Sequence, residues 1–310
     1  MTWVSAAQPE HVSTEIAAIA NFARGFSLEA TRPTREEVQE LREIVPEGTR
    51  VYVSAVATRP NNEVVEGAIK LRNAGFEPVP HLAVRNFQSD SEMQEFLTRL
   101  VAEAGVTRLL VIAGDRADPA GPLHSAIEVI DGGVLKRHGI AEIGIAGYPE
   151  GHPRIPGGEL ERALADKISA AQATGMSLSI VSQFCFEAKP ILAWIDQLRA
   201  FGIELPLRIG LPGPSSLSTL LHYAHRCGVR ASAQGLARQA GLVRQIFALS
   251  APDALVRALA EARGESTTGI VAPHFFSFGG LLRSARWAAA VSHGRVALQS
   301  DDGFRVEPAR

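Results

Sequence analysis

Residues 141–153, AEIGIAGYPEGHP, give the clearest indication of the fold. The first seven residues form a short apolar run, and this run stops at a turn that carries Tyr148, Glu150 and His152. A short apolar run bounded by glycine and proline is typical of a strand that is buried on both faces. The polar residues that follow it lie at the carboxyl end of this strand, where α/β proteins carry their functional side chains.

The same unit recurs along the chain. The predicted strands are 25–30, 50–57, 78–83, 107–113, 141–147, 178–183, 206–211 and 270–276. Eight strands separated by helical patterns predict an α/β fold, a single (β/α)8 TIM barrel over residues 1–310, with residues 1–24 as an N-terminal helical extension. An open doubly wound sheet is the rival fold. It usually has a glycine-rich turn after its first strand, and here residues 29–33, EATRP, contain no glycine.

Periodicity and capping signals predict the helices between the strands. Thr34 followed by Glu37 forms a capping-box pattern, and a second helix is predicted to begin with a cap at Ser91. Two extra helices are predicted before the last strand, at 234–248 and 252–262. The other predicted helices are 34–45, 61–74, 91–104, 122–137, 158–175, 188–200, 215–227 and 279–291.

The composition excludes several classes of protein. Lysine and arginine total 31 against 33 acidic residues, so we expect no binding to nucleic acid or to a membrane through bulk positive charge. The two cysteines, Cys185 and Cys227, are too few for a disulfide framework or a cysteine zinc site. The opening residues lack the pattern of a signal peptide, and no apolar run of about 18 residues occurs. We therefore expect a cytoplasmic protein without a membrane span.

Polar residues lie at or just after the carboxyl ends of most of the predicted strands. They are Glu29, His81, Gly114 with Asp115, Tyr148 with Glu150 and His152, Gln183, and His274. In a barrel these positions lie on one rim, so the acids, histidines and amide predict a catalytic mouth. A metal site is not predicted, because the sequence contains none of the ligand spacings of zinc enzymes.

Most of these residues also have a purely structural interpretation. Glu29 is compatible with a helix N-terminus, and Asp115 is compatible with a loop residue that bonds its own backbone. His81 and His274 are each compatible with a histidine of the core. A buried amide without partners costs about 1–3 kcal/mol, which favours a functional partner for Gln183.

Taken in chain order, the strand-end segments resemble the methylenetetrahydrofolate reductase family. IGIAGYPEGHP (143–153) resembles the fifth-strand signature of that family, and SQFCFE (182–187) is similar to its TQFFFD segment. Further matches are Glu29 in the first strand, PHL at 80–82, GD at 114–115 and LPGPS at 211–215. The resemblance runs from about residue 25 to about residue 290.

The resemblance implies a barrel that binds FAD noncovalently and takes electrons from NADH or NADPH. It implies interconversion of 5,10-methylenetetrahydrofolate and 5-methyltetrahydrofolate, with Glu29 as general acid and Asp115 as a second catalytic residue. Gln183 and Leu217 match positions that contact the tetrahydrofolate derivative. The positions that match FAD contacts are His81, Gly114, Asp115, Tyr148, His152 and Lys167. A homo-oligomer is expected from the resemblance alone.

The chain departs from the family pattern at several positions. The family arginine before Gly-Asp is Ala113 here, and the stacking phenylalanine is Leu217. These departures keep two alternatives open. One is a flavin-free member in which NADH or NADPH reduces the folate directly, and the other is a non-catalytic protein that binds folate or flavin.

Overall fold

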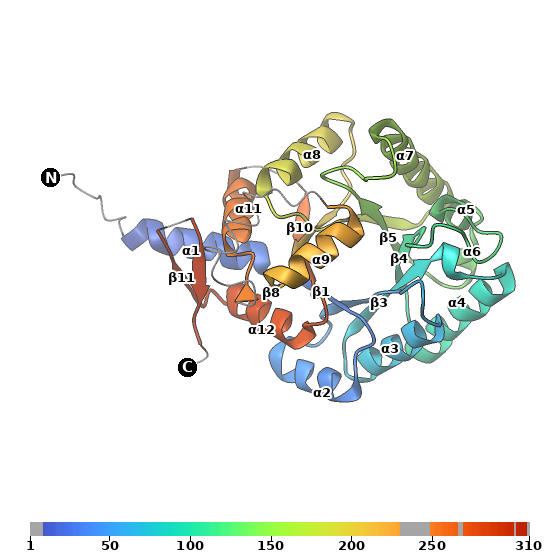
Figure 1. The fold of residues 1–310 in the computed structure, drawn as a ribbon, viewed down its shortest axis with the longest axis horizontal. Helices are drawn as coiled ribbons and strands as arrows, with labels where there is room; N and C mark the ends of the chain where they lie inside the picture. Colours follow the sequence, from blue (N-terminus) through green and yellow to red (C-terminus); the bar gives the residue numbers. More distant parts are fainter. Residues whose placement is uncertain (1–8, 230–248, 266–268, 301, 309–310) are drawn as a thin grey trace.

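The chain forms the predicted closed barrel of parallel strands with helices between them (Figure 1). The computed structural model describes residues 9–229, 249–265, 269–300 and 302–308. The strand order around the barrel is β1-β10-β7-β6-β5-β4-β3-β2, and every neighbouring pair is parallel. The barrel strands are β1 (Ser27–Ala30), β2 (Arg50–Val53), β3 (Glu77–Ala83), β4 (Arg108–Ile112), β5 (Glu142–Gly147), β6 (Ser177–Ser182), β7 (Leu207–Pro212) and β10 (Ile270–Phe276).

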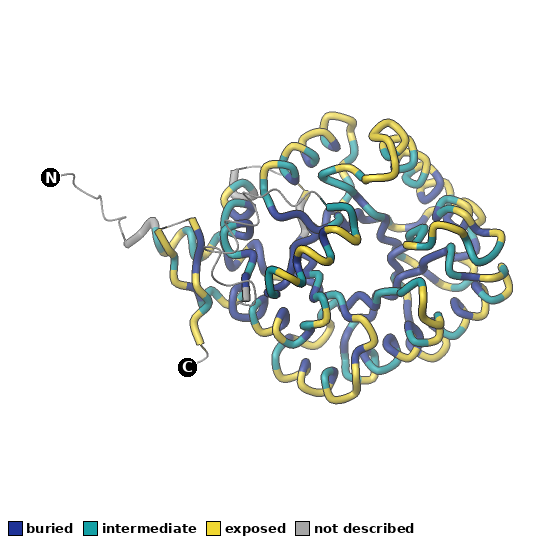
Figure 2. Tube along the Cα trace, in the orientation of Figure 1, coloured by how far each residue is buried: buried dark blue, intermediate teal, exposed yellow. Residues whose placement is uncertain are grey.

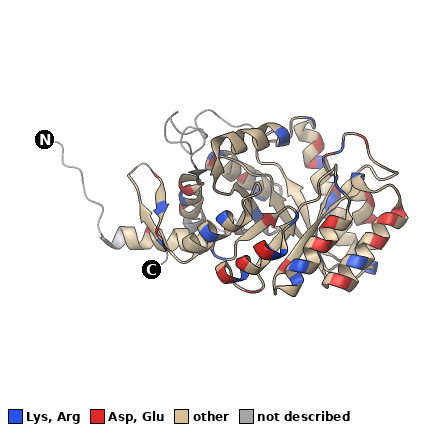
Figure 3. Cartoon of the chain, turned by 60° about the horizontal axis from the view of Figure 1, so that its bottom comes forward, with Lys and Arg blue, Asp and Glu red and all other residues tan. Residues whose placement is uncertain are grey.

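Helices surround the strands and present their apolar faces to them (Figure 2). The N-terminal extension forms α1, which packs against α11 and α12. The helices are α1 (Pro9–Ala23), α2 (Arg35–Ile44), α3 (Asn62–Asn73), the 3-10 turn η1 (Val84–Asn86), α4 (Asp90–Ala104), α5 (Ala126–Asp131), α6 (Val134–Arg137), α7 (Gly157–Thr174), α8 (Ala188–Ala200), α9 (Leu217–Cys227), α11 (Asp253–Glu265) and α12 (Leu281–Ser292). Acidic and basic side chains are interspersed on the helices in view in Figure 3.

Two layers of apolar side chains hold this arrangement together. The larger layer lies between the strands and the helices, because alternate strand residues point outward to meet the helices. The smaller one fills the barrel interior and includes Tyr52, Val79, Leu110 and Val181. Interior residues on the same strands continue toward the carboxyl end, and these residues form the rim described below.

Helix boundaries match the prediction where a capping residue determines them. Thr34 accepts a hydrogen bond from the Glu37 N–H, and the Glu37 carboxylate accepts one from the Thr34 N–H, so the predicted capping box is confirmed. The cap of α4 was predicted at Ser91 and is Ser89 instead. Ser89 has an extended backbone and its hydroxyl accepts the Glu92 N–H, whereas Ser91 lies within the first turn.

The single helix predicted at 122–137 is wrong. The segment forms two short helices, α5 and α6, because Gly132 and Gly133 interrupt it and Gly133 adopts a left-handed φ of 62°. Strand β2 ends at Val53 rather than at residue 57. The extra helix predicted at 252–262 is confirmed as α11, and the one predicted at 234–248 lies outside the described residues.

Two small antiparallel pairs were not predicted. Strands β11 (Val296–Leu298) and β12 (Phe304–Val306) form a hairpin after α12, and β8 (Ser215–Ser216) pairs with β9 (Leu249–Ser250). Strands of two or three residues are too short to give a periodic signal in the sequence.

Candidate active site

Glu29 lies inside the carboxyl end of the barrel with a histidine on either side. Its side chain is 17% exposed, and Glu29 Oε2 lies 3.6 Å from His81 Nε2 and 3.9 Å from His274 Nε2. The pairing of the strands explains why these three side chains lie together, because β1 pairs with β10 on one side and with β2 on the other. Closure of the barrel therefore brings together residues from β1, β3 and β10.

Burial disfavours the charged form of each of these three groups. It raises the pKa of the Glu29 carboxyl, and the negative charge of Asp115 raises it further, whereas His81 and the Ser54 hydroxyl act in the opposite direction. Burial lowers the pKa of His81 to about 4 and that of His274 to about 3. A buried carboxyl between two neutral imidazoles retains its proton more readily than an exposed one, as a general acid requires.

The two histidines differ in their other contacts. His274 is fully buried, and its Nδ1 lies 2.9 Å from the Ser27 hydroxyl. Arg208 in turn donates to Ser27 Oγ over 3.3 Å and to the Gly25 carbonyl over 3.2 Å. The Nε2 atoms of both His81 and His274 are buried without a hydrogen-bond partner in the described part of the chain. Each of these ring nitrogens is directed toward Glu29.

Asp115 lies on the rim above Glu29. It follows Gly114, whose φ is 96° and where a Cβ would approach Ala83 Cβ to 3.1 Å, so this turn requires glycine. The Asp115 side chain is 69% exposed and lies 3.6 Å from Arg226. An ion pair this exposed contributes at most about 1 kcal/mol, so a bound ligand can displace Arg226 from Asp115.

Helix α9 lies across this rim. Its residues Leu220 and Tyr223 pack with Phe184 and Phe278, which follow β6 and β10, while Arg226 reaches the loop after β4. Leu217, a predicted substrate contact, is the first residue of α9 and is partly buried. The helix therefore connects three of the loops that surround the mouth.

Gln183 lies at the carboxyl end of β6, as predicted. Its backbone N–H donates to the Gly147 carbonyl, and its side-chain oxygen accepts the Phe184 N–H over 3.1 Å. No described protein group accepts from its side-chain NH2. The amide therefore has an anchored acceptor and a donor that is available to a ligand.

Tyr148, His152 and Lys167 form a second group after β5. The Tyr148 and His152 rings meet edge to face with centroids 5.3 Å apart, and His152 Nδ1 accepts the Arg154 N–H. Burial lowers the pKa of Lys167, which has no ion-pair partner among the described residues. A partly buried cation without a carboxylate suits a ligand that carries a negative group.

Sequence reasoning missed the support for Glu29. It listed His274 among the residues of the predicted mouth, with a core histidine as the competing interpretation, and it did not single out Ser27 or Arg208. The position of His274 at the end of the last strand was the available signal, because closure places that strand beside the first one. A cavity of about 660 Å3 lies at the opposite end of the barrel, beside Arg24, Arg50 and Arg208.

Neither a membrane helix nor a metal cluster is found in the described part of the chain. None of the described helices is long and apolar enough to cross a bilayer. The described histidines, cysteines and acids contain no group of three or more with the arrangement of a metal site.

Comparison with known proteins identifies relatives of the chain. The family model for methylenetetrahydrofolate reductase matches residues 27–238, which is more than half of the chain. A 5,10-methylenetetrahydrofolate reductase of Pectobacterium carotovorum is 27% identical over 158 residues, covering 50% of each protein. Methylenetetrahydrofolate reductase 1 of Schizosaccharomyces pombe is 23% identical over 181 residues, 55% of this chain and 28% of the yeast protein. The matches thus span half or less of the relatives' own length.

One solved structure is similar over most of the chain. It is an uncharacterized protein from Clostridium thermocellum that binds two copies of 5-methyl-5,6,7,8-tetrahydrofolic acid. The TM-score is 0.58 at 12% sequence identity, with 89% of this chain and 96% of that chain covered. At this identity the similarity supports the barrel fold.

Proposed function

Since the chain belongs to the methylenetetrahydrofolate reductase family, we propose that it interconverts 5,10-methylenetetrahydrofolate and 5-methyltetrahydrofolate, with Glu29 as the general acid. The observation that carries the proposal is the environment of Glu29. This carboxyl lies in the barrel mouth, 3.6 and 3.9 Å from two histidines that burial keeps neutral, and burial raises its own pKa. The Clostridium thermocellum barrel binds a folate of the same class as the proposed product.

The chemistry requires a proton at one defined atom. When the methylene bridge of the folate opens to an iminium ion, the departing ring nitrogen takes up a proton. Protonated Glu29 donates this proton, and the carboxylate that remains faces His81 and His274. A hydride then adds to the iminium carbon to form the methyl group. In the opposite direction the Glu29 carboxylate accepts the proton back.

The neighbouring residues are proposed to orient the folate. Gln183 presents an NH2 donor beside an anchored carbonyl oxygen, a pattern that pairs with the edge of a pterin ring. Asp115 is proposed to release Arg226 and to bind the substrate in place of this arginine. The negative charge of Asp115 also helps to keep Glu29 protonated. Leu217 contributes an apolar contact from the start of α9.

FAD is the proposed hydride donor, itself reduced by NADH or NADPH, and it supplies the hydride when bound. Tyr148, His152 and Lys167 are proposed to hold it, because their loop and helix offer aromatic surface and a cation without an acidic partner among the described residues. Gly114 and Asp115 border the same rim. His81 would also contact FAD, and in the structure its Nε2 faces Glu29.

The alternatives from the sequence make different predictions. Ala113 replaces an arginine of the family pattern, so a flavin-free member that uses NADH or NADPH directly is the second candidate. The visible spectrum after incubation with FAD and desalting separates the two. Retained flavin absorbance supports the first, and colourless protein with folate-dependent NADH or NADPH oxidation supports the second. Colourless protein without turnover contradicts both and leaves a folate-binding protein.

The Glu29→Gln variant tests the general acid. It keeps the size of the side chain and removes the proton, so we expect folate turnover to fall by about 10²- to 10⁴-fold, with folate and cofactor binding retained. Glu63→Gln is the matched control, since Glu63 lies within 4 Å of Arg32 and Arg59 and not among neutral histidines. Full turnover in Glu29→Gln would show that the proton comes from another group.

A further inference from the structure

We infer that Arg208, Ser27 and His274 form a hydrogen-bonded line through the barrel interior that fixes the tautomer of His274, with its Nε2–H directed at Glu29. Ser27 and Arg208 are positioning residues in this arrangement, because they act on Glu29 through His274. The inference rests on the proposed function of Glu29 as proton donor.

The line crosses from the amino-terminal half of the barrel to the mouth. Arg208 Nη1 lies 3.3 Å from Ser27 Oγ, and Ser27 Oγ lies 2.9 Å from His274 Nδ1. On the far side of the ring, His274 Nε2 lies 3.9 Å from Glu29 Oε2. Ser27 and Glu29 are two residues apart on β1, so both point into the barrel and the ring of His274 lies beside them.

The chemistry of the donors determines the direction of each hydrogen bond. A guanidinium group only donates, so Ser27 Oγ accepts from Arg208. No other acceptor for the single Ser27 proton is found among the described residues, so this proton points to His274 Nδ1. A ring nitrogen that accepts a hydrogen bond carries no proton, so the proton of the neutral imidazole is on Nε2.

The resulting Nε2–H has no acceptor within hydrogen-bond range among the described residues. Nε2 of His274 is buried without a hydrogen-bond partner in the described part of the chain, and Glu29 Oε2 at 3.9 Å is beyond hydrogen-bond range. Once Glu29 has given its proton to the substrate, the carboxylate becomes a strong acceptor that this N–H can reach with a small side-chain movement. The neutral ring therefore stabilises the carboxylate that catalysis produces, without placing a permanent positive charge beside the acid.

Arg208 has a second effect on the same ring. It is buried, and its positive charge, together with burial, keeps His274 from taking up a second proton. Tyr52 packs edge to face on the His274 ring, with centroids 4.5 Å apart.

The groups that face Glu29 from the other elements are His81 on β3, Ser54 after β2, Asp115 after β4 and Cys227 on α9.

The tautomer is measurable without any activity. In protein with ¹⁵N-labelled histidine, the two ring nitrogens of His274 are assigned by comparison with His274→Gln. We expect a non-protonated, hydrogen-bonded Nδ1 and a protonated Nε2, both unchanged between pH 8 and pH 5. In Ser27→Ala the two nitrogens should move toward a mixture of tautomers, while Ser27→Thr keeps the hydroxyl and should keep the wild-type spectrum.

Two results would overturn the inference. One is a His274 ring protonated on Nδ1, or on both nitrogens, in the wild-type protein. The other is an Nε2–H tautomer that persists unchanged in Ser27→Ala. The wild-type spectrum alone decides the first point, so the test does not depend on the folding of a variant.

Turnover supplies the functional readout. Ser27→Ala should lower kcat by about tenfold, the lower limit for losing a hydrogen bond to a charged group, with a much smaller change in the KM for folate. The alkaline limb of the pH profile should move to higher pH, because a less stabilised carboxylate raises the pKa of Glu29. Ser284→Ala is the matched control, since Ser284 is also a fully buried serine and its hydroxyl has no partner among the described residues.

The outcomes separate this inference from the proposed function. If the tautomer is as expected but Glu29→Gln retains turnover, the function of Glu29 is wrong and the line is only structural. If Glu29→Gln is inactive but Ser27→Ala keeps the wild-type pH profile and kcat, the general acid stands and the positioning role is wrong.

Discussion

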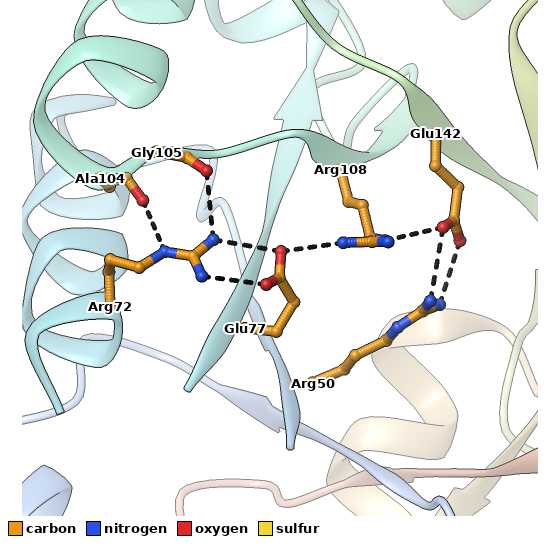
Figure 4. Close-up of polar contacts among 7 residues, drawn as sticks. All are labelled: Arg50, Arg72, Glu77, Ala104, Gly105, Arg108 and Glu142. Carbon is orange, nitrogen blue, oxygen red and sulfur yellow. Dashed lines mark hydrogen bonds and ion pairs between the residues drawn. The ribbon is translucent and has the colours of Figure 1, made fainter. Parts of the chain in front are cut away.

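The two ends of the barrel hold carboxylates of similar exposure that have different kinds of partner. At the amino-terminal end, Glu77 and Glu142 have side chains 18% and 21% exposed, and Glu29 at the carboxyl end is 17% exposed. Glu77 lies between Arg72 and Arg108, and Glu142 lies between Arg50 and Arg108 (Figure 4). Glu29 lies between two neutral histidines instead. The degree of exposure is therefore not what distinguishes a structural carboxylate from a candidate catalytic one.

The partners produce the difference. Each arginine of the amino-terminal network donates charge-assisted hydrogen bonds to one or both of these carboxylates, and the bonds of Arg108 join β4 to its neighbours β3 and β5. Glu29 has no cation within 4 Å in the described part of the chain. The same type of residue thus stabilises the fold at one end and is available to exchange a proton at the other.

The largest expected effect is a loss of stability in acid that originates at the carboxyl end. The unfolded chain protonates His81 and His274 below about pH 6.5, whereas the folded protein keeps them neutral down to about pH 4 and pH 3. Stability should therefore fall as pH drops below 6.5, by roughly 1.4 kcal/mol per pH unit for each histidine. Glu29 has the opposite effect on stability. Because its pKa is raised in the folded protein, the folded protein binds a proton at Glu29 at a higher pH than the unfolded chain does, and this favours the folded state as the pH falls.

The variant His274→Gln measures the contribution of one histidine to this pH dependence of stability. Urea unfolding between pH 7 and pH 5 should show a slope smaller by about one proton than in the wild-type protein. His225→Gln, which changes an exposed histidine of α9, should leave the slope unchanged. Equal slopes in His274→Gln and the wild type would mean that His274 is not held neutral.

At the amino-terminal end, Glu142→Gln should cost stability and spare turnover. The change removes the negative charge that Arg50 and Arg108 share, and we expect the free energy of unfolding to fall by about 2–4 kcal/mol at pH 7. Turnover per folded molecule should remain, because Glu142 and its arginines lie at the first residues of their strands, whereas Glu29 lies near the carboxyl end of β1.

Urea unfolding measures the stability change, and Glu103→Gln is its control. Glu103 pairs with Arg99 on the exposed surface of α4, so its loss should leave the stability almost unchanged. A Glu142→Gln protein as stable as Glu103→Gln would remove the contrast between the two ends.

The smallest expected effect concerns the exposed pair on the rim. Arg226→Gln frees Asp115 for the proposed substrate, so the KM for folate should fall by at most about fivefold, with stability almost unchanged. Steady-state kinetics at low salt measure this change, and the difference should shrink in 0.5 M NaCl because salt screens the pair in the wild-type protein. An increase in KM would instead make Arg226 a substrate contact.

Local sequence patterns were sufficient for the elements of the fold. The strand at 142–147 and its seven counterparts were predicted because a buried parallel strand must be almost continuously apolar, and the composition of such a run records this directly. The capping box at Thr34 was predicted because both of its hydrogen bonds join residues three apart. The break at Gly132 and Gly133 was missed, although its signal was local.

Local patterns also placed Glu29, Asp115 and Gln183 on the rim, because each lies at or just after the carboxyl end of a predicted strand. They did not show which of these residues meet. Asp115 pairs with Arg226 from α9, and His81 faces Glu29 from two strands away, contacts that depend on how loops and strands pack.

The sequence by itself therefore determined the strands, the helices and the set of polar residues at the strand ends. Tertiary structure alone decided the environment of Glu29. Ser27 and His274 are 247 residues apart, and Arg208 reaches Ser27 across 181 residues. They meet because the barrel closes by pairing its last strand with its first, and no periodicity in the chain encodes contacts over such a separation.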